Sequence, residues 1–205
     1  MKRTVYHTTK IHRFQYPKAG QSKDILHSWI LKHSTEWDIS GCVEEKFSYV
    51  KKKHKGVRKT VGWNVFENYN PPLEFSEVIG FAHEKIFKLK KGYYTPAYGF
   101  DPGEPMMPLI LTNAWGQYYN KGDYQESHNH VPNHWAWTYF VNTPPGSSPM
   151  CFDKPSKLQI NVHEGLLLVF PAYLWHYVPP CNCDGRSIIV GNFAYDFRGE
   201  PIYNY

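Results

Sequence analysis

The segment GLLLVFPAYLWH, residues 165–176, contains the longest apolar run of the sequence, which spans Leu166 to Phe170 and is followed by a proline turn and a histidine. Such a run has the length of a buried strand and lies far below the ~18 residues needed to cross a membrane. Similar short apolar or alternating runs lie around it, over residues 109–119, 135–141, 150–152, 158–162, 175–178 and 187–195. Clusters of Gly, Pro, Asn and Asp separate them. Short strands with turns and no intervening helix predict a sandwich or barrel.

Two amphipathic helices are predicted ahead of this β-rich half. Residues 73–91 repeat apolar side chains at helical spacing, and a lysine-rich last turn before Gly92 suits a helix C-terminus. Residues 23–33 show a shorter helical pattern, with Ser22 as the expected N-cap. These helices are expected to buttress the β core.

Length and composition favour one folded domain. The chain has 205 residues, of which 41% are hydrophobic and 20% charged, as in a folded globular protein. Alternation over residues 5–14 predicts an edge strand. Residues 1–92 are therefore expected to supply helices and edge strands, and residues 93–205 the barrel. The first residues lack the apolar stretch of a secretion signal, so the expected location is cytoplasmic.

Positive charge is concentrated in the first half of the chain. Residues 1–100 carry a net charge of +9 and residues 101–205 a net charge of −4, which gives +5 overall. Most of the excess lies in a basic run from Lys51 to Lys59, which is expected to be a mobile, solvated loop. The run leaves nucleic acid or an acidic partner open as a ligand, but no nucleic-acid-binding motif accompanies it, so nucleic acid is not expected.

The four cysteines do not predict a disulfide-stabilised fold. Cys181 and Cys183 form a CxC pair, whereas Cys42 and Cys151 stand alone, and no four zinc ligands occur at a usual spacing. Reduced thiols are therefore expected.

Three of the eleven histidines lie in contexts that predict a metal site. His128 and His130 are two residues apart, so on a strand their side chains leave from the same face with Cα atoms about 7 Å apart. Two imidazoles in this relation can bind the same metal ion. His176 follows the buried run and the proline turn, and is the third candidate. His134 and His163 are expected to be structural or to support the ligands.

These histidine contexts resemble the double-stranded β-helix that cupins share with iron(II)/2-oxoglutarate oxygenases. Gly122-(x)5-His128-x-His130 resembles the first cupin motif, and Pro171-(x)4-His176 resembles part of the second. The cupin pattern then fails, because the glutamate expected after the HxH pair and the asparagine expected after His176 are both missing.

The oxygenase pattern covers more of the chain. Tyr119-x-x-Gly122-(x)5-His128-x-His130 is similar to the prolyl-hydroxylase-like pattern Y-x-x-G-(x)5-H-x-D. Arg186 lies ten residues after the last of the three histidines, where that superfamily places the basic residue for 2-oxoglutarate. As an ordered set, the motifs are most similar to the 2-oxoglutarate oxygenases of bacteria and tailed phages, over residues 109–193.

The resemblance implies a mainly β fold, a double-stranded β-helix of the jelly-roll or cupin-like type buttressed by a few N-terminal helices. It also implies a non-haem Fe(II) and 2-oxoglutarate-dependent hydroxylase, which couples decarboxylation of 2-oxoglutarate to oxidation of a substrate C–H bond. Iron is expected on His128, His130 and His176. The 2-oxoglutarate is expected on Arg186, whose planar guanidinium suits a carboxylate, and on the hydroxyl of Tyr119.

Several alternatives stay open. The superfamily has a carboxylate where this chain has His130, and three neutral imidazoles leave the site one negative charge short. Asp123, Glu126 and Asp153 are therefore further candidate ligands, and a surface ion pair with Asp184 is the alternative for the arginine.

The alternative functions are a cupin-like three-histidine metal enzyme or binding module without 2-oxoglutarate, and a non-catalytic interaction protein. A protein side chain such as proline, a free small molecule and a nucleobase all stay open as the substrate. Trp135 and Trp137 are candidates to border its entrance.

Overall fold

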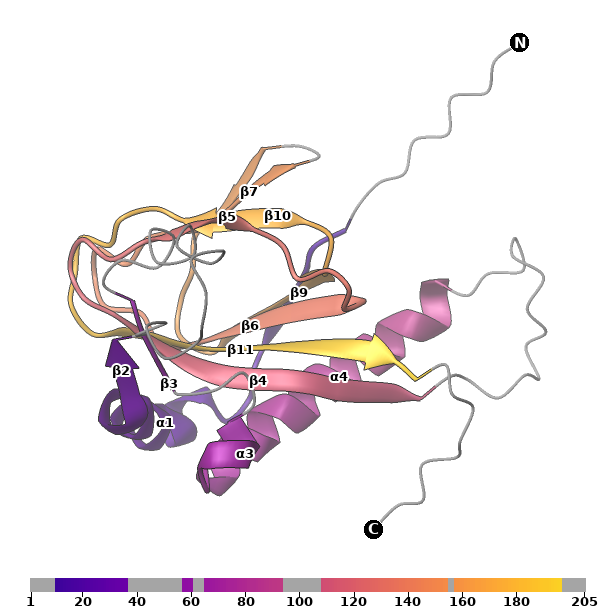
Figure 1. Ribbon diagram of the computed structural model, residues 1–205, viewed down its shortest axis with the longest axis horizontal. Helices are drawn as coiled ribbons and strands as arrows, with labels where there is room; N and C mark the ends of the chain where they lie inside the picture. Colours follow the sequence, from indigo (N-terminus) through magenta and orange to yellow (C-terminus); the bar gives the residue numbers. More distant parts are fainter. Residues whose placement is uncertain (1–9, 37–56, 61–64, 94–107, 155–156, 197–205) are drawn as a thin grey trace, which may run out of the picture.

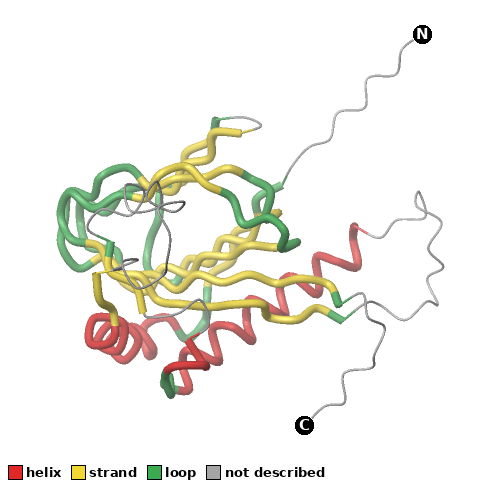
Figure 2. The backbone as a smooth tube through the Cα atoms, viewed as in Figure 1, coloured by secondary structure: helices red, strands yellow, loops and turns green. Residues whose placement is uncertain are grey.

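The computed structural model describes residues 10–36, 57–60, 65–93, 108–154 and 157–196. Within them, two antiparallel sheets face each other, and the helices lie against the outer side of the larger one (Figures 1 and 2). The larger sheet has the strand order β1-β9-β6-β11-β4-β3-β2 and the smaller one the order β5-β10-β7-β8. The strands are β1 (His12–Gln15), β2 (Ser34–Glu36), β3 (Arg58–Thr60), β4 (Leu109–Tyr119), β5 (Gln125–His128), β6 (Trp135–Asn142), β7 (Met150–Lys154), β8 (Leu158–Ile160), β9 (Leu166–Pro171), β10 (Trp175–Val178) and β11 (Arg186–Tyr195).

From β4 onward the chain alternates between the two sheets. Strands β4, β6, β9 and β11 lie in the larger sheet, and β5, β7 and β10 lie in the smaller one, with β8 paired to β7 as a hairpin. This winding is that of a double-stranded β-helix, so the predicted fold class is confirmed.

Two apolar cores follow from the alternation of side chains along the strands. On β11, Ile188 and Val190 face the inner core between the sheets, whereas Ile189 and Phe193 face the outer core beneath the helices. Strand β9 is apolar on both faces because it borders both cores, which explains the continuous run that dominates its sequence.

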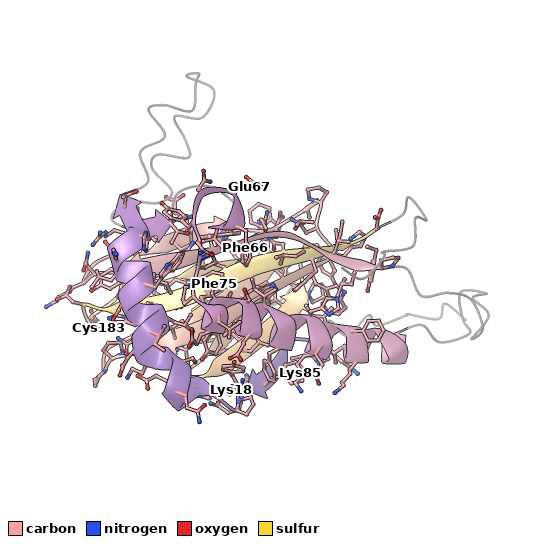
Figure 3. The ribbon with its side chains drawn as sticks, turned by 90° about the horizontal axis from the view of Figure 1, so that it is seen from below. Lys18, Phe66, Glu67, Phe75, Lys85 and Cys183 are labelled. Atoms are coloured by element: carbon pink, nitrogen blue, oxygen red, sulfur yellow. The ribbon has the colours of Figure 1, made fainter. Side chains whose placement is uncertain are left out.

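Helices α1 (Ala19–His33) and α4 (Leu73–Tyr93) lie across the outer face of the larger sheet, and the short helix α3 (Val65–Asn68) lies beside them (Figure 3). Helix α1 approaches the sheet where β4 has a glycine. A Cβ atom added to Gly116 would lie 2.8 Å from Cγ1 of Ile30. The sequence thus allows the helix to pack on the backbone of the strand.

Two predicted helix boundaries are wrong. Helix α1 begins at Ala19, one turn earlier than its apolar pattern indicates, and Lys18 occupies the N-cap. Ser22 is instead buried inside the helix, where its hydroxyl donates to the Lys18 carbonyl oxygen. Helix α4 continues through Gly92 to Tyr93. Caps marked by polar or glycine residues are weak signals when the helix is held by packing on a sheet.

The basic run does not behave as a loop over its whole length. Residues 51–56 lie outside the described residues, but Arg58 to Thr60 form β3, and Lys59 is only 6% exposed. The prediction of a mobile, solvated segment is therefore wrong at this end. Pairing of β3 with β4 places alternate residues on the inner face, which the local charge pattern could not show.

Two further predictions concern aromatic and thiol groups. Trp135 and Trp137 belong to the outer core, so they do not border the space between the sheets. Cys151, Cys181 and Cys183 are free thiols, and Cys42 lies outside the described residues.

The edge-strand prediction holds for β1, at the rim of the larger sheet; residues 5–9 are not described. The described helices include none that is both long and apolar enough to span a membrane.

Candidate metal centre

Three histidines meet between the sheets at the end of β5 and the start of β10. The candidate ligand atoms of His128, His130 and His176 all lie within 4.8 Å of one another. His128 ends β5 and is opposite His176 of β10 in the register of the smaller sheet. His130 lies two residues beyond the strand, and its backbone N–H donates to the carbonyl oxygen of Ala172, 2.8 Å away. The expectation of one strand carrying both histidines of the pair is wrong, yet the turn before β10 brings His130 to the same site.

Backbone contacts leave the metal-binding nitrogen of two of these rings available. Nδ1 of His128 lies 2.8 Å from the Glu126 carbonyl oxygen, and Nδ1 of His176 lies 2.9 Å from that of Leu174. Because a carbonyl oxygen only accepts, Nδ1 carries the proton in both rings and Nε2 presents its lone pair. This is the usual arrangement of metal-binding histidines, whose second nitrogen donates to a carbonyl or carboxylate.

The three rings are held in the neutral form that binds metals. Burial lowers the pKa of His176 to about 4. Burial also lowers the pKa of His128 and of His130 well below the usual value, and the neighbouring His176 lowers both further. His176 is buried, whereas His128 and His130 are partly exposed, so the cluster has one open side.

The acids that the sequence left open as ligands do not join the cluster. Among the described residues, the group that can hold a metal consists of the three histidines. The carboxylate of Asp123 accepts from the backbone N–H of Asn120, and that of Asp153 accepts from the hydroxyl of Ser127. His134 packs against the ring of Tyr195, and His163 lies exposed near the start of β9, so neither belongs to the cluster.

Arg186 lies fully buried on the inner face of β11. Its exposed fraction is 0%, and none of its three guanidinium nitrogens has a hydrogen-bond partner among the described residues. Its Cζ atom stacks 4.5 Å from the ring centre of Tyr119 and 5.6 Å from that of Phe140. The alternative of a surface ion pair with Asp184 is wrong, because Asp184 accepts instead from the backbone N–H of Lys121. A buried cation with unused donors is a site for an anion.

Tyr119 contributes its ring to the arginine and its hydroxyl to another side chain. It is opposite Arg186 in the register of β4 and β11, and its hydroxyl donates to Oε1 of Gln117 over 2.7 Å. Burial raises the pKa of Tyr119 to about 12, and the charge of Arg186 opposes that shift. The tyrosine is therefore protonated at any ordinary pH. Its predicted contact with 2-oxoglutarate stays a prediction.

Two polar residues on this inner face were missed from the sequence. Gln117 is two residues before Tyr119 on β4, and Lys59 of β3 is directly opposite Gln117. Together with Tyr119 and Arg186 they form a row of four side chains across three strands, called here the polar row. Gln117 could have been noticed as a polar residue within a predicted apolar strand. Lys59 could not be distinguished from the other lysines of the basic run.

The comparisons with known proteins agree with this fold. The sequence matches no protein-family model and no curated protein. Its structure is similar to a Pseudomonas putida prolyl-4-hydroxylase, with a TM-score of 0.58, 11% sequence identity, and coverage of 92% of this chain and 94% of that one.

Two further solved structures are also similar to this one. The viral collagen prolyl hydroxylase of Paramecium bursaria Chlorella virus-1, in its 2-oxoglutarate complex, gives a TM-score of 0.57 at 14% identity, covering 89% of this chain and 94% of that one. HygX from Streptomyces hygroscopicus, with nickel, 2-oxoglutarate and hygromycin B bound, gives 0.55 at 11% identity, covering 93% and 84%.

Proposed function

We propose that the protein is an Fe(II)- and 2-oxoglutarate-dependent oxygenase, most simply a hydroxylase. The observation that carries the proposal is the pairing of two features on the inner faces of a double-stranded β-helix. One is a three-histidine cluster with two Nε2 lone pairs facing inward, and the other is a fully buried arginine with three unused nitrogens. Similar structures with a metal and 2-oxoglutarate bound support this reading.

The residues fit an iron ion with an open side. His128, His130 and His176 would hold it, because three protein ligands leave further positions for a co-substrate and oxygen. A bound ferrous ion would supply the activation of O₂. The chain itself keeps the imidazoles neutral by burial and fixes the orientation of two rings through the carbonyls of Glu126 and Leu174.

The residues also fit a dicarboxylate. One carboxylate of 2-oxoglutarate would bind the guanidinium of Arg186, which offers two parallel donors in a fixed plane. Tyr119 and Phe140 hold that plane by stacking against it from β4 and β6. The overall reaction balances as one 2-oxoglutarate and one O₂ giving succinate and CO₂, while the remaining oxygen atom enters a substrate C–H bond.

The decisive experiment is anaerobic titration of the metal-free protein with Fe(II) and then with 2-oxoglutarate. Visible charge-transfer absorption is expected on adding 2-oxoglutarate, and succinate is expected on admitting O₂. Succinate itself and 2-oxobutyrate, which has no second carboxylate, serve as control ligands. Absence of any 2-oxoglutarate binding at millimolar concentration would contradict the proposal.

One observation favours a second candidate. The described cluster has no carboxylate ligand, so a cupin-like metal enzyme or binding module that uses three histidines without 2-oxoglutarate is the alternative. It predicts stoichiometric metal binding with no response to 2-oxoglutarate in the same titration. A non-catalytic interaction protein predicts neither.

Similar structures do not select the substrate. One of them is a collagen prolyl hydroxylase and another holds hygromycin B, a small molecule. We propose that the substrate is either a protein side chain or a small molecule.

A further inference from the structure

Lys59 faces the space between the sheets, on the same side as the proposed catalytic site. Val57, two residues earlier, belongs to the inner core, and Gln117, directly opposite, lies between Trp115 and Tyr119 of that core. Side chains two residues apart on a strand, and side chains opposite each other across a pair, lie on the same face. The lysine is therefore one of two cationic side chains in the polar row.

The polar row connects the arginine end of the site with the histidine end. Trp115, two residues before Gln117 on β4, has its ring centre 6.2 Å from that of His130. Arg186 is opposite Tyr119, two residues after Gln117. Lys59 is opposite Gln117, so along the strand direction it lies between Trp115, which is near the histidines, and Tyr119, which is beside Arg186. Two strand spacings and two residues separate its Cα atom from that of Arg186, or about 12 Å, so the two cations are separate anchors.

The lysine is buried in spite of its charge, with an exposed fraction of 6%. Burial lowers the pKa of Lys59 itself to about 7. A bound anion is the ligand that reverses this penalty, because a nearby negative charge favours the ammonium form.

The side chain of Gln117, opposite the lysine, can donate a hydrogen bond to an anion. Oε1 of Gln117 accepts from the hydroxyl of Tyr119, so its amide nitrogen carries the donors that a ligand can use. An ammonium group and an amide N–H₂ on residues opposite each other in a strand pair can donate to the two oxygens of one carboxylate.

We propose that Lys59, with the amide nitrogen of Gln117, binds a carboxylate of the substrate in the space between the sheets that also contains the metal centre. The proposal rests on the proposed function for the metal and the co-substrate. It narrows the substrate to molecules with a free carboxylate near the carbon that is oxidised. Arg186 remains the anchor of 2-oxoglutarate, and Lys59 is a second, separate anchor.

The test uses [¹³C]formate, the smallest carboxylate, as a probe of the full-length protein loaded with Mn(II) and saturated with 2-oxoglutarate. Manganese shortens the ¹³C relaxation time of any formate held close to it, so no turnover is needed. Saturable enhancement is expected in the wild type. Lys59→Met is expected to weaken formate binding about ten- to a hundredfold, the loss of one charge-assisted hydrogen bond, while 2-oxoglutarate affinity stays within about twofold. Neutral formamide is expected not to compete.

Lys85→Met is the matched control. Lys85 lies on α4, on the far side of the larger sheet, with its ammonium over the ring of Phe81 (Figure 3). This variant is expected to bind formate as the wild type does. Equal formate binding by Lys59→Met and the wild type overturns the proposal. A loss of 2-oxoglutarate affinity in Lys59→Met also overturns it, because the lysine then holds the co-substrate.

A second measurement separates this inference from the proposed function. Crystals of the metal-free wild type soaked in formate are expected to show the ion beside Nζ of Lys59, even if the protein uses no 2-oxoglutarate. An empty Lys59 in such crystals contradicts the inference, whereas failure of 2-oxoglutarate to bind contradicts the proposed function alone. The soaked crystal also decides the matter if Lys59→Met does not fold.

Discussion

Nε2 of His130 and Nε2 of His176 lie 3.2 Å apart, with their rings stacked at an interplanar angle of 15°. The His176 ring keeps its proton on Nδ1, which donates to the Leu174 carbonyl, so its Nε2 accepts. The short distance is then a hydrogen bond in which His130 donates from Nε2. A metal ion takes the place of that proton, because both lone pairs must point to the ion.

The first prediction is therefore a change of tautomer on metal binding. In metal-free protein, ¹⁵N spectra are expected to show His130 protonated at Nε2 and His176 protonated at Nδ1. Addition of Zn(II) is expected to leave the proton of His176 in place and to remove that of His130 from Nε2. An unchanged His130 signal at full metal occupancy would show that its ring is not a ligand.

The second prediction concerns the ligands themselves. Replacing His128 or His176 by Ala is expected to weaken Fe(II) or Zn(II) binding by at least tenfold in folded protein, because each loses one ligand bond. His163→Ala, at an exposed position outside the cluster, is the control and is expected to bind metal normally. Isothermal titration under anaerobic conditions measures both. Stoichiometric binding with unchanged affinity in either ligand variant places the metal elsewhere.

The third prediction tests the anchor of the co-substrate. Arg186→Ala is expected to weaken 2-oxoglutarate binding by roughly 30- to several-thousand-fold, which corresponds to about 2–5 kcal/mol for one lost buried charge pair. Arg186→Lys is also expected to be damaging, since an ammonium cannot make two parallel hydrogen bonds. Arg13→Ala, on the exposed side of β1, is the control. If 2-oxoglutarate binds equally well without the guanidinium, another group holds it.

The fourth prediction is a pH dependence of stability that comes from Lys59. Its pKa is about 7 in the folded protein and 10.5 in the unfolded chain, so between these values the unfolded state binds more protons. The free energy of unfolding is therefore expected to rise between pH 7 and pH 9, by up to about 1.4 kcal/mol per pH unit from this group. Urea unfolding of the wild type and Lys59→Met at pH 7, 8 and 9 isolates the contribution. Parallel slopes in the two proteins would contradict it.

The fifth prediction compares two glycines. Gly116→Ala is expected to lower the free energy of unfolding by about 1–3 kcal/mol, because the new Cβ meets the buried side chain of Ile30. Gly80→Ala on α4 is the control: the added Cβ meets no described atom within 4 Å outside its own helix. That change is expected to stabilise by roughly 0.5–1 kcal/mol through helix propensity. Urea midpoints measure both, and a neutral Gly116→Ala would show that α1 can shift.

The class of the fold and the cluster of three histidines could be predicted from the amino-acid sequence alone. Apolar runs of strand length separated by turn residues report directly on burial, because alternate residues of a strand must enter a core. The resemblance to the oxygenase pattern, which depends on the order and spacing of motifs in the linear chain, pointed to the histidine contexts, the proline turn and Arg186.

The other polar residues of the inner face could be recognised only from the folded chain. Lys59 and Gln117 come from segments far apart in the sequence, and the register of β3 on β4 makes them neighbours. Pairing with β4 also buries the end of the basic run as strand β3. Trp135 and Trp137 pack in the outer core and therefore lie away from the site. Strand pairing is non-local: β3 pairs with a strand that lies far along the chain, and a one-residue change of register reverses which face each side chain occupies.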